Sequence, residues 1–264
     1  MKKEFKTLEI THPREHVLLI TLNRPEVRNA LNTHMMQELY EIWHSYYIEP
    51  RNVRCIIMTG AGDKAFCSGA DLKERHGITA KIWQQQHALL ERMISAMSEC
   101  PLPIIAAVNG YAMGAGLELM LACDFAYGSD NSQFAFPEAK LGIIPGAMGT
   151  QQLPRAIGVR RAKEFCMSGQ VISAAQAMHY GLLNKIFPKQ ELLAKSIEMA
   201  ETIAKQAPIA IQQLKRALNM SEELGLREGY CFELEAYNRC IATKDRLEGV
   251  AAFNEKREPV FTGE

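Results

Sequence analysis

The sequence has no excess of charge of either sign. Its 264 residues include 30 lysines and arginines and 30 aspartates and glutamates, so the formal net charge is zero. A protein that binds nucleic acid over its whole surface carries a basic excess, so we expect no nucleic-acid partner. Proteins of near-zero net charge also tend to associate, which is consistent with an oligomer.

The chain also lacks paired cysteine motifs. Its seven cysteines are an odd number and are widely spread, with no C-x-x-C pair. This pattern argues against a disulfide framework and against a structural zinc site. The seven histidines form no H-E-x-x-H motif, so we predict no metal site and treat every histidine as a solvated or core-edge residue.

Long apolar runs are missing as well. No segment approaches 18 consecutive apolar residues, and the charged N-terminus has no apolar stretch of signal-peptide length. We therefore expect no membrane contact and a cytoplasmic location. With 47% hydrophobic and 23% charged residues, the composition is that of an ordinary globular protein.

Short apolar runs alternate with amphipathic stretches in the first half of the chain, a pattern typical of packed strands and helices. Helices are predicted from about Asn32, a suitable N-cap, and over about 80–98. We predict strands at 17–22, 53–58 and 104–108. The strand starts are loosely periodic, as though strand and helix units were repeated around a common core.

From about residue 160 the strand signals give way to helices. Ser173 is a suitable N-cap for a short helix that stops at Gly181. Longer helices are predicted near 190–206, 208–219, 222–239 and 246–254. Their apolar residues need cover, which the core or a neighbouring subunit would supply.

Three segments carry residues suited to chemistry. The first is the loop Cys67-Ser68-Gly69-Ala70-Asp71-Leu72, whose small side chains let a ligand approach backbone N–H groups closely. A tight turn without further function is the alternative. Ser68 lacks the G-x-S-x-G pattern of a hydrolase nucleophile, so a serine hydrolase is not supported.

The second segment is the glycine-rich turn at 109–118, between an apolar strand and an apolar helix. It places N–H donors at a helix N-terminus, which suits an oxyanion. Gly114-x-Gly116 also resembles a dinucleotide-binding fingerprint, but Leu119 replaces the third glycine, so a Rossmann dehydrogenase is weakly supported. Glu118 adds a carboxylate in the first helical turn, where favourable placement in the helix dipole would also explain it.

The third segment, 133–138, surrounds a second carboxylate with apolar residues. Glu138 follows Pro137, and an apolar environment raises the proton affinity of a carboxyl group, as acid-base catalysis near neutral pH requires. Taken singly, Glu138 could equally be a surface loop residue. Two such carboxylates, each beside a glycine-rich turn, form a candidate catalytic pair.

These segments closely resemble the enoyl-CoA hydratase/isomerase, or crotonase, superfamily, and the match covers nearly the whole chain. The similar stretches are 22–25 through 29–32, 65–74, 106–124, 136–150, 243–249 and 252–257. Several motifs in the family's order make an accidental match improbable.

The resemblance implies an α/β fold with a crotonase-like core of repeated ββα units that form a superhelix, followed by an all-helical oligomerisation region. On this basis we predict a core with the active site over residues 1–195 and a helical trimerisation region over 196–264. We expect a homotrimer or a dimer of trimers. The change of character near residue 160 agrees with this organisation.

The resemblance also assigns a candidate site. Backbone N–H groups of Ala70 and Ala115 would form an oxyanion hole. Hydratases commonly have glycine at the second position, and alanine keeps the N–H without strain if its φ is negative. The two catalytic glutamates of hydratases match Glu118 and Glu138, and the presence of both favours hydration over double-bond isomerisation.

The implied reaction is the reversible syn addition of water across the C2=C3 double bond of a 2-enoyl-CoA thioester. We assign Glu118 to orient and activate the water and Glu138 to donate the proton to C2. The oxyanion hole would stabilise the charge on the thioester oxygen. No cofactor is expected, because coenzyme A is part of the substrate.

Coenzyme A would lie across the same loops. The backbone of Ala70, Asp71 and Leu72 would contact it, and the acyl pocket would draw on residues 77–86 and the C-terminal helices. Ordinary solvated charge is an equal alternative for the basic residues. The residues predicted to bind substrate or CoA are Arg24, Ser68, Ala70, Asp71, Leu72, Lys73, Gly114 and, reaching a neighbour's site, Phe253 and Lys256.

Other activities of the same family remain open. The stretch 70–75 and the tail 243–257 look particularly similar to 3-methylglutaconyl-CoA hydratases of leucine breakdown, which would change the acyl group but not the reaction class. Another crotonase activity, such as enoyl-CoA isomerisation, is a further alternative. Some related proteins also bind RNA, which provides a hypothesis of a different class that the zero net charge disfavours.

Overall fold

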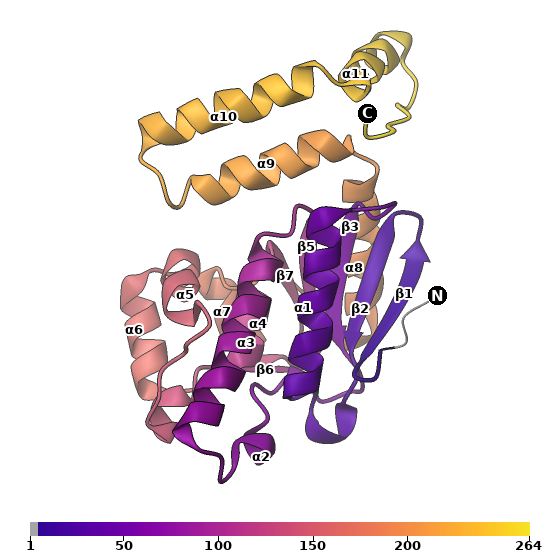
Figure 1. Cartoon of the computed structure of the whole chain (residues 1–264). Helices are drawn as coiled ribbons and strands as arrows, with labels where there is room; N and C mark the ends of the chain where they lie inside the picture. The colour runs from indigo at the N-terminus through magenta and orange to yellow at the C-terminus, as the bar shows by residue number, and fades with distance from the viewer. Residues whose placement is uncertain (1–4) are drawn as a thin grey trace.

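A six-stranded sheet runs through the centre of the molecule (Figure 1). The computed structural model describes residues 5–264. β1 and β2 form an antiparallel hairpin, and the other neighbouring strands are parallel. In spatial order the strands are β1 (Leu8–Arg14), β2 (Val17–Leu22), β3 (Cys55–Gly60), β5 (Ile104–Val108), β7 (Phe125–Ser129) and β10 (Lys185–Phe187).

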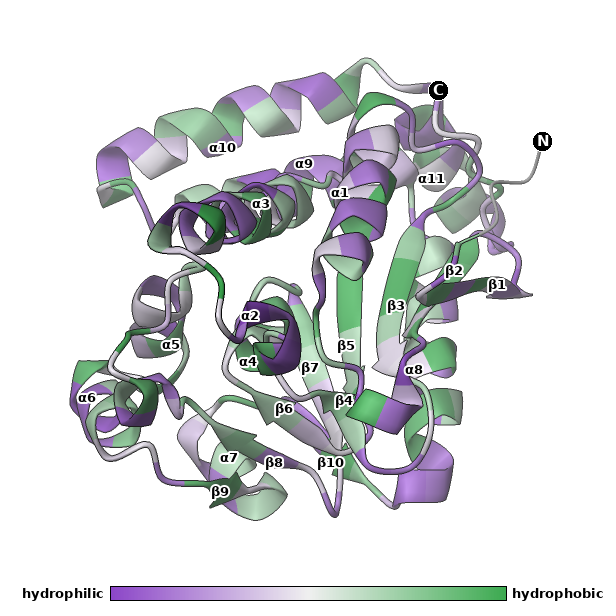
Figure 2. Cartoon of the chain, turned by 60° about the horizontal axis from the view of Figure 1, so that its bottom comes forward, coloured by the Kyte–Doolittle hydropathy of each residue, from purple (hydrophilic) through white to green (hydrophobic). Residues whose placement is uncertain are grey.

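A second, smaller sheet accompanies the first (Figure 2). β3, β5 and β7 of the large sheet are each followed along the chain by one strand of the small sheet and then by helical structure. The predicted repetition of ββα units is therefore confirmed. In spatial order the small sheet comprises β4 (Ala65–Cys67), β6 (Tyr111–Met113), β8 (Gln133–Ala135) and β9 (Ile172–Ser173).

The strand order of the large sheet follows the chain from one edge to the other without reversing. A Rossmann sheet binds its dinucleotide at the point where the strand order reverses. Since the described sheet has no such point, the Rossmann alternative is not supported.

The helices begin and end close to the predicted positions. Asn32 accepts a hydrogen bond from the Met35 N–H at the start of α1, and Ser173 forms a capping box at the start of α7. The helices are η1 (Pro25–Val27), α1 (Thr33–Ile48), α2 (Leu72–Arg75), α3 (Ala80–Ser98), α4 (Ala115–Leu121), η2 (Glu138–Leu141), α5 (Gly149–Ile157), α6 (Val159–Ser168), α7 (Ala174–Tyr180), α8 (Lys189–Ala204), α9 (Pro208–Met220), α10 (Leu226–Ile241) and α11 (Lys244–Glu255).

The large sheet is covered on both faces. In β3, Ile56 and Met58 pack into the cluster that includes α1 and α3, whereas Cys55 and Ile57 pack into the cluster that includes α8. Burial on both faces explains the nearly continuous apolar character of β3 and β5, because parallel strands between helical layers have no solvent-facing side.

Helices α9, α10 and α11 form a layer at one end of the molecule (Figure 1). α9 packs against α10. The predicted division at 195/196 falls inside α8, which packs on the large sheet, so the separation of the chain into two domains stays a prediction. None of the described helices combines the length and apolar character needed to cross a bilayer.

The short strands of the small sheet are the main feature that the sequence pattern did not reveal. Ala65–Cys67, for example, is a strand, although Cys67 was predicted to lie in a loop. Three residues are too few for a two-residue periodicity to stand out. The strand predicted at 53–58 also starts two residues later, at Cys55, and the helix predicted from 222 starts at Leu226.

Candidate active site

The three segments selected from the sequence meet at one cavity of about 580 Å³. The loop after β4 contributes Ala70, the start of α4 contributes Ala115 and Glu118, and η2 contributes Glu138. The remaining wall comes mostly from α2, α3 and residues 141–146. Four residues that lie far apart in the sequence therefore border a common space.

Glu118 is fixed at the wall of this cavity by backbone donors. Its side chain is buried on α4, and Oε1 accepts hydrogen bonds from the N–H groups of Ala147 (2.7 Å) and Gly149 (3.0 Å). Burial raises the pKa of Glu118, and the two N–H groups together with His87 partly offset this. A Cβ at Gly149 would lie 2.7 Å from Oε1, so this close approach depends on glycine.

Glu138 is the less constrained carboxyl group. It is the first residue of η2, is 8% exposed, and its Oε2 is buried without a hydrogen-bond partner in the described chain. Burial, with a contribution from the charge of Glu118, raises the pKa of Glu138 to about 7. Glu138 is therefore suited to exchanging a proton near neutral pH.

Gly114 lies between the two glutamates. Its carbonyl accepts a hydrogen bond from the Glu118 N–H at 3.0 Å, and a Cβ on Gly114 would lie 2.6 Å from Oε1 of Glu138. Its φ of +53° lies in the left-handed region that favours glycine. The turn thus needs glycine both for its conformation and for the approach of Glu138.

Two backbone amides complete the arrangement. Ala115 is the first residue of α4, and the positive φ in this turn belongs to Gly114, so the strain that alanine would suffer at a positive φ does not arise. The loop of Ala70 lies against this turn, since a Cβ on Gly69 would come within 3.6 Å of the Ala115 nitrogen. Neither the Ala70 nor the Ala115 N–H has a hydrogen-bond acceptor within residues 5–264, which leaves both as donors for an anionic oxygen.

A model of the enoyl-CoA hydratase/isomerase family matches residues 13–264. The chain belongs to the enoyl-CoA hydratase/isomerase family. As a member it is an enzyme of the hydratase, or hydro-lyase, class that acts on an acyl-CoA substrate.

Individual relatives match this chain over nearly their whole length. The crystal structure of enoyl-CoA hydratase from Bacillus anthracis superimposes with a TM-score of 0.96 at 43% identity, covering 98% of this chain and 100% of that one. The enoyl-CoA hydratase/isomerase YngF of Bacillus subtilis is 44% identical over 96% of this chain and 97% of its own. The 2,3-dehydroadipyl-CoA hydratase of Escherichia coli is 39% identical over 96% and 98%. The crotonase-like fold predicted from the sequence is confirmed.

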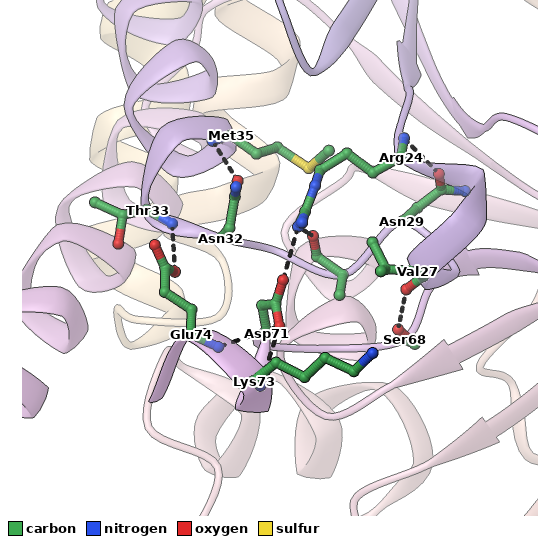
Figure 3. A network of polar contacts seen from close by, with 11 residues as sticks. Arg24, Val27, Asn29, Asn32, Thr33, Met35, Ser68, Asp71, Lys73 and Glu74 are labelled. Atoms are coloured by element: carbon green, nitrogen blue, oxygen red, sulfur yellow. Dashed lines mark hydrogen bonds and ion pairs between the residues drawn. The ribbon is translucent and has the colours of Figure 1, made fainter. Parts of the chain in front are cut away.

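Some residues predicted to bind the substrate of this enoyl-CoA hydratase/isomerase border the cavity and others lie beside it. Ser68, Leu72 and Gly114 line it. Asp71 is buried behind the loop, where Oδ1 accepts from the first N–H groups of α2 and Oδ2 accepts from Nη1 of Arg24 at 3.0 Å (Figure 3). This ion pair braces the loop that carries Ala70.

The other residues predicted to contact CoA lie outside the cavity of their own chain. Lys73 is exposed, and Figure 3 draws its side chain extended with no contact at the amine. Phe253, 84% exposed, and Lys256 belong to the α11 end of the helical layer, and neither borders the cavity of its own chain. Their contribution to a neighbour's site stays a prediction.

Sequence reasoning gave no individual role to Arg75, Trp83 and His87, although all three line the cavity. His87 was expected to be an ordinary solvated or core-edge histidine, yet its charge acts on Glu118. Trp83 and His87 are four residues apart, so they share one face of α3. That spacing was the available signal, although it does not by itself distinguish a site from a core face. Trp83 does fall within the stretch 77–86 expected to line the acyl pocket.

Proposed function

We propose that this protein catalyses the reversible syn addition of water across the C2=C3 double bond of 2-enoyl-CoA thioesters. The observation that carries the proposal is the pair Glu118 and Glu138, two buried carboxyl groups that border one cavity beside two unpaired backbone N–H groups. Adding water to the double bond needs a nucleophile at C3, a proton at C2 and stabilisation of charge on the thioester oxygen. The cavity offers a group for each task.

The two glutamates take different parts. Two backbone N–H groups donate to Oε1 of Glu118 and so fix the orientation of the carboxyl group. The other oxygen, Oε2, accepts a proton from the attacking water. Glu138, with a pKa of about 7, is largely protonated below neutral pH and donates its proton to C2. Delivery of water and proton from the same side of the substrate gives syn addition. Positioned acid-base groups contribute about 10²- to 10⁴-fold each.

The N–H groups of Ala70 and Ala115 stabilise the enolate that forms as water attacks. They are backbone groups in a braced loop and at a helix N-terminus, so they need no reorganisation when charge develops. Each such donor contributes about 3 to 4 kcal/mol in the transition state. Because their donors are part of the backbone, substitution of either alanine side chain leaves the hydrogen bonds available.

Coenzyme A, as part of the substrate, would lie along the backbone of Ala70, Asp71 and Leu72, with Arg24 and Lys73 beside it. Phe253 and Lys256 would complete the site of a neighbouring subunit in a homotrimer or a dimer of trimers. We place the enzyme in the cytoplasm, in fatty acid metabolism by β-oxidation. No further cofactor takes part in the proposed reaction.

The acyl group is the open part of the proposal. One relative is named for hydration of 2,3-dehydroadipyl-CoA, and resemblance in the stretch 70–75 favours 3-methylglutaconyl-CoA as an alternative substrate. Double-bond isomerisation of 3-enoyl-CoA is the second activity to consider, since the family includes isomerases. The presence of both glutamates favours hydration.

Crotonyl-CoA hydration, followed by loss of the conjugated-thioester absorbance, tests the function. Glu118→Gln and Glu138→Gln should each lower kcat by about 10²- to 10⁴-fold while the dissociation constant of a saturated acyl-CoA changes little. Glu191→Gln, at the first turn of α8 and outside the cavity, is a control expected to retain activity. Near-wild-type turnover in both glutamate variants would refute the assignment, and conversion of 3-enoyl-CoA without hydration would identify an isomerase.

A further inference from the structure

Arg75, the last residue of α2, is a buried cation in the wall of the cavity. The residue is 8% exposed and borders the same space as the two glutamates. Among the residues of the described chain that border this cavity, it is the only lysine or arginine. Its Nη2 is inaccessible to solvent and has no hydrogen-bond partner within residues 5–264.

Within residues 5–264 the Arg75 guanidinium has no ion-pair or hydrogen-bond partner, although the charge of its neighbour Glu74 acts on it. The guanidinium carbon lies 4.7 Å from the centre of the Trp83 ring. The adjacent carboxylate, Glu74, accepts a hydrogen bond from the Thr33 N–H at 2.8 Å at the start of α1 (Figure 3). A guanidinium removed from water is costly without an anionic partner. Stacking on an aromatic ring offsets only part of this cost, so an anion beside Arg75 would be strongly stabilised.

Helix α3 relates Arg75 to the reacting carbons. His87 lines the cavity together with Glu118, and a Cβ on Gly146, next to the Glu118 donor Ala147, would lie 2.6 Å from the His87 ring. Trp83 lies one turn earlier on the same helix, a rise of about 6 Å, and Arg75 stacks on Trp83. Arg75 therefore borders the part of the cavity lined by Trp83, near the start of α3. Because Arg75 and both glutamates border one cavity of about 580 Å³, an acyl chain held with C2 and C3 at the glutamates has room to extend to Arg75.

We propose that Arg75 binds a carboxylate at the distal end of the acyl chain, so that the enzyme prefers 2-enoyl-CoA thioesters of dicarboxylic acids. This inference rests on the proposed function, because the hydratase arrangement places the acyl chain in this cavity. A guanidinium matches a carboxylate with two parallel N–H donors. A terminal methyl group would leave the buried charge without a partner, which disfavours the unsubstituted chain.

Binding of saturated thioesters tests the inference without requiring turnover. The dissociation constants of adipoyl-CoA, hexanoyl-CoA and free CoA are measured for the wild type and for Arg75→Met. Charge-assisted hydrogen bonds are strong enough that Arg75→Met should weaken adipoyl-CoA binding by about 10- to 100-fold. The constant for free CoA should stay within about twofold, and hexanoyl-CoA should bind as well as before or more tightly, because the buried charge that disfavours its methyl end is gone.

Arg161→Met is the matched control. The Arg161 guanidinium also lies 4.7 Å from an aromatic ring, that of Tyr180, but Arg161 is on α6 and does not border the cavity. Arg161→Met should leave all three dissociation constants unchanged. Arg75→Gln, which is neutral and polar, supplies the same comparison if Arg75→Met does not fold.

Two results would overturn the inference. If Arg75→Met weakens the binding of adipoyl-CoA, hexanoyl-CoA and CoA equally, Arg75 contacts the CoA moiety. If the substitution weakens the binding of none of them, Arg75 takes no part in binding. Turnover separates this inference from the proposed function. Suppose that 2-hexenedioyl-CoA and 2-hexenoyl-CoA are both hydrated, and that the ratio of their kcat/KM values is the same in the wild type and in Arg75→Met. Then only the inference fails. If neither is hydrated while adipoyl-CoA binding still depends on Arg75, only the hydratase function fails.

Discussion

The ββα core and the C-terminal helices bury their apolar residues in different ways. Every residue of β5 is buried, and the large sheet has a hydrophobic cluster on each face. In α9 and α10 the buried residues are only Lys215 and Ala236. Large exposed apolar side chains of these two helices include Leu214, Leu218, Leu226, Tyr230 and Tyr237. The core therefore completes its own packing, whereas the helical layer leaves apolar surface that an adjoining subunit could cover.

Polar contacts hold the helical layer to the core. Nζ of Lys215 on α9 donates to the Leu102 carbonyl at 2.8 Å and to the Asp124 carboxylate at 2.9 Å. The Arg54 guanidinium donates to the carbonyls of Ala204 and Phe261. The cavity is therefore held by a densely packed core, whereas α9 is attached through specific charged groups.

A pair of leucines gives the largest expected contrast between the two regions. Leu39 on α1 is completely buried, so Leu39→Ala should lower the free energy of unfolding by about 2 to 5 kcal/mol. Leu226 at the start of α10 is 93% exposed, so Leu226→Ala should change that of the single chain by less than about 0.5 kcal/mol. Urea unfolding measures both. A large loss in Leu226→Ala that depends on protein concentration would show that another chain covers α10.

Removing the polar anchor of α9 should have a smaller effect. Lys215→Met removes the ion pair of the partly buried Asp124 carboxylate, which keeps its hydrogen bond from the Ile104 N–H, and leaves the Leu102 carbonyl without the amine. The substitution should cost about 1 to 3 kcal/mol. Lys205→Met is the control, because that amine pairs with Glu201 at the surface and contributes less than about 1 kcal/mol. Denaturant unfolding gives the stability, and limited proteolysis shows whether cleavage begins in α9–α11. Equal effects of the two substitutions would contradict the anchoring role.

A change of pH should alter the hydration rate, which depends on the cavity, but not the oligomeric state, which we expect to depend on the helical layer. The pKa of Glu138 is raised to about 7, so its protonated, donating form is present below that pH and is lost above it. Hydration should therefore fall by up to about tenfold per pH unit above 7, with an apparent pKa that belongs to the glutamate pair. Light scattering at pH 6 and pH 8.5 should give the same molar mass. A hydration rate that stays flat from pH 6 to 9 would remove Glu138 as the proton donor.

Much of the fold was predictable because its signals are local. The N-cap at Asn32, the capping box at Ser173 and the apolar run of β5 each depend on residues close together in the sequence. The segments around Ala70, Glu118 and Glu138 were also identifiable, because glycine-rich turns and isolated carboxylates stand out against apolar surroundings. Resemblance to a known family then joined these segments into one predicted site.

Other features depended on distant contacts that leave no local pattern. The small sheet pairs three-residue strands far apart in the sequence, and the contribution of His87 depends on its position in the same cavity wall as Glu118. Arg75 likewise resembles a surface residue in the sequence, because three of the four residues of α2 are charged. Its burial against Trp83 follows from tertiary packing alone.

The sequence by itself indicated the candidate residues of the site and the turns that hold them, because helix caps, glycines and apolar runs act over a few residues. Only the tertiary structure decided the protonation behaviour of Glu138 and the burial of Arg75. Desolvation and electrostatic interaction depend on everything within several ångströms, whatever its distance along the chain. Desolvation therefore raises the pKa of a carboxyl group at one wall of the cavity and lowers the pKa of a guanidinium at another.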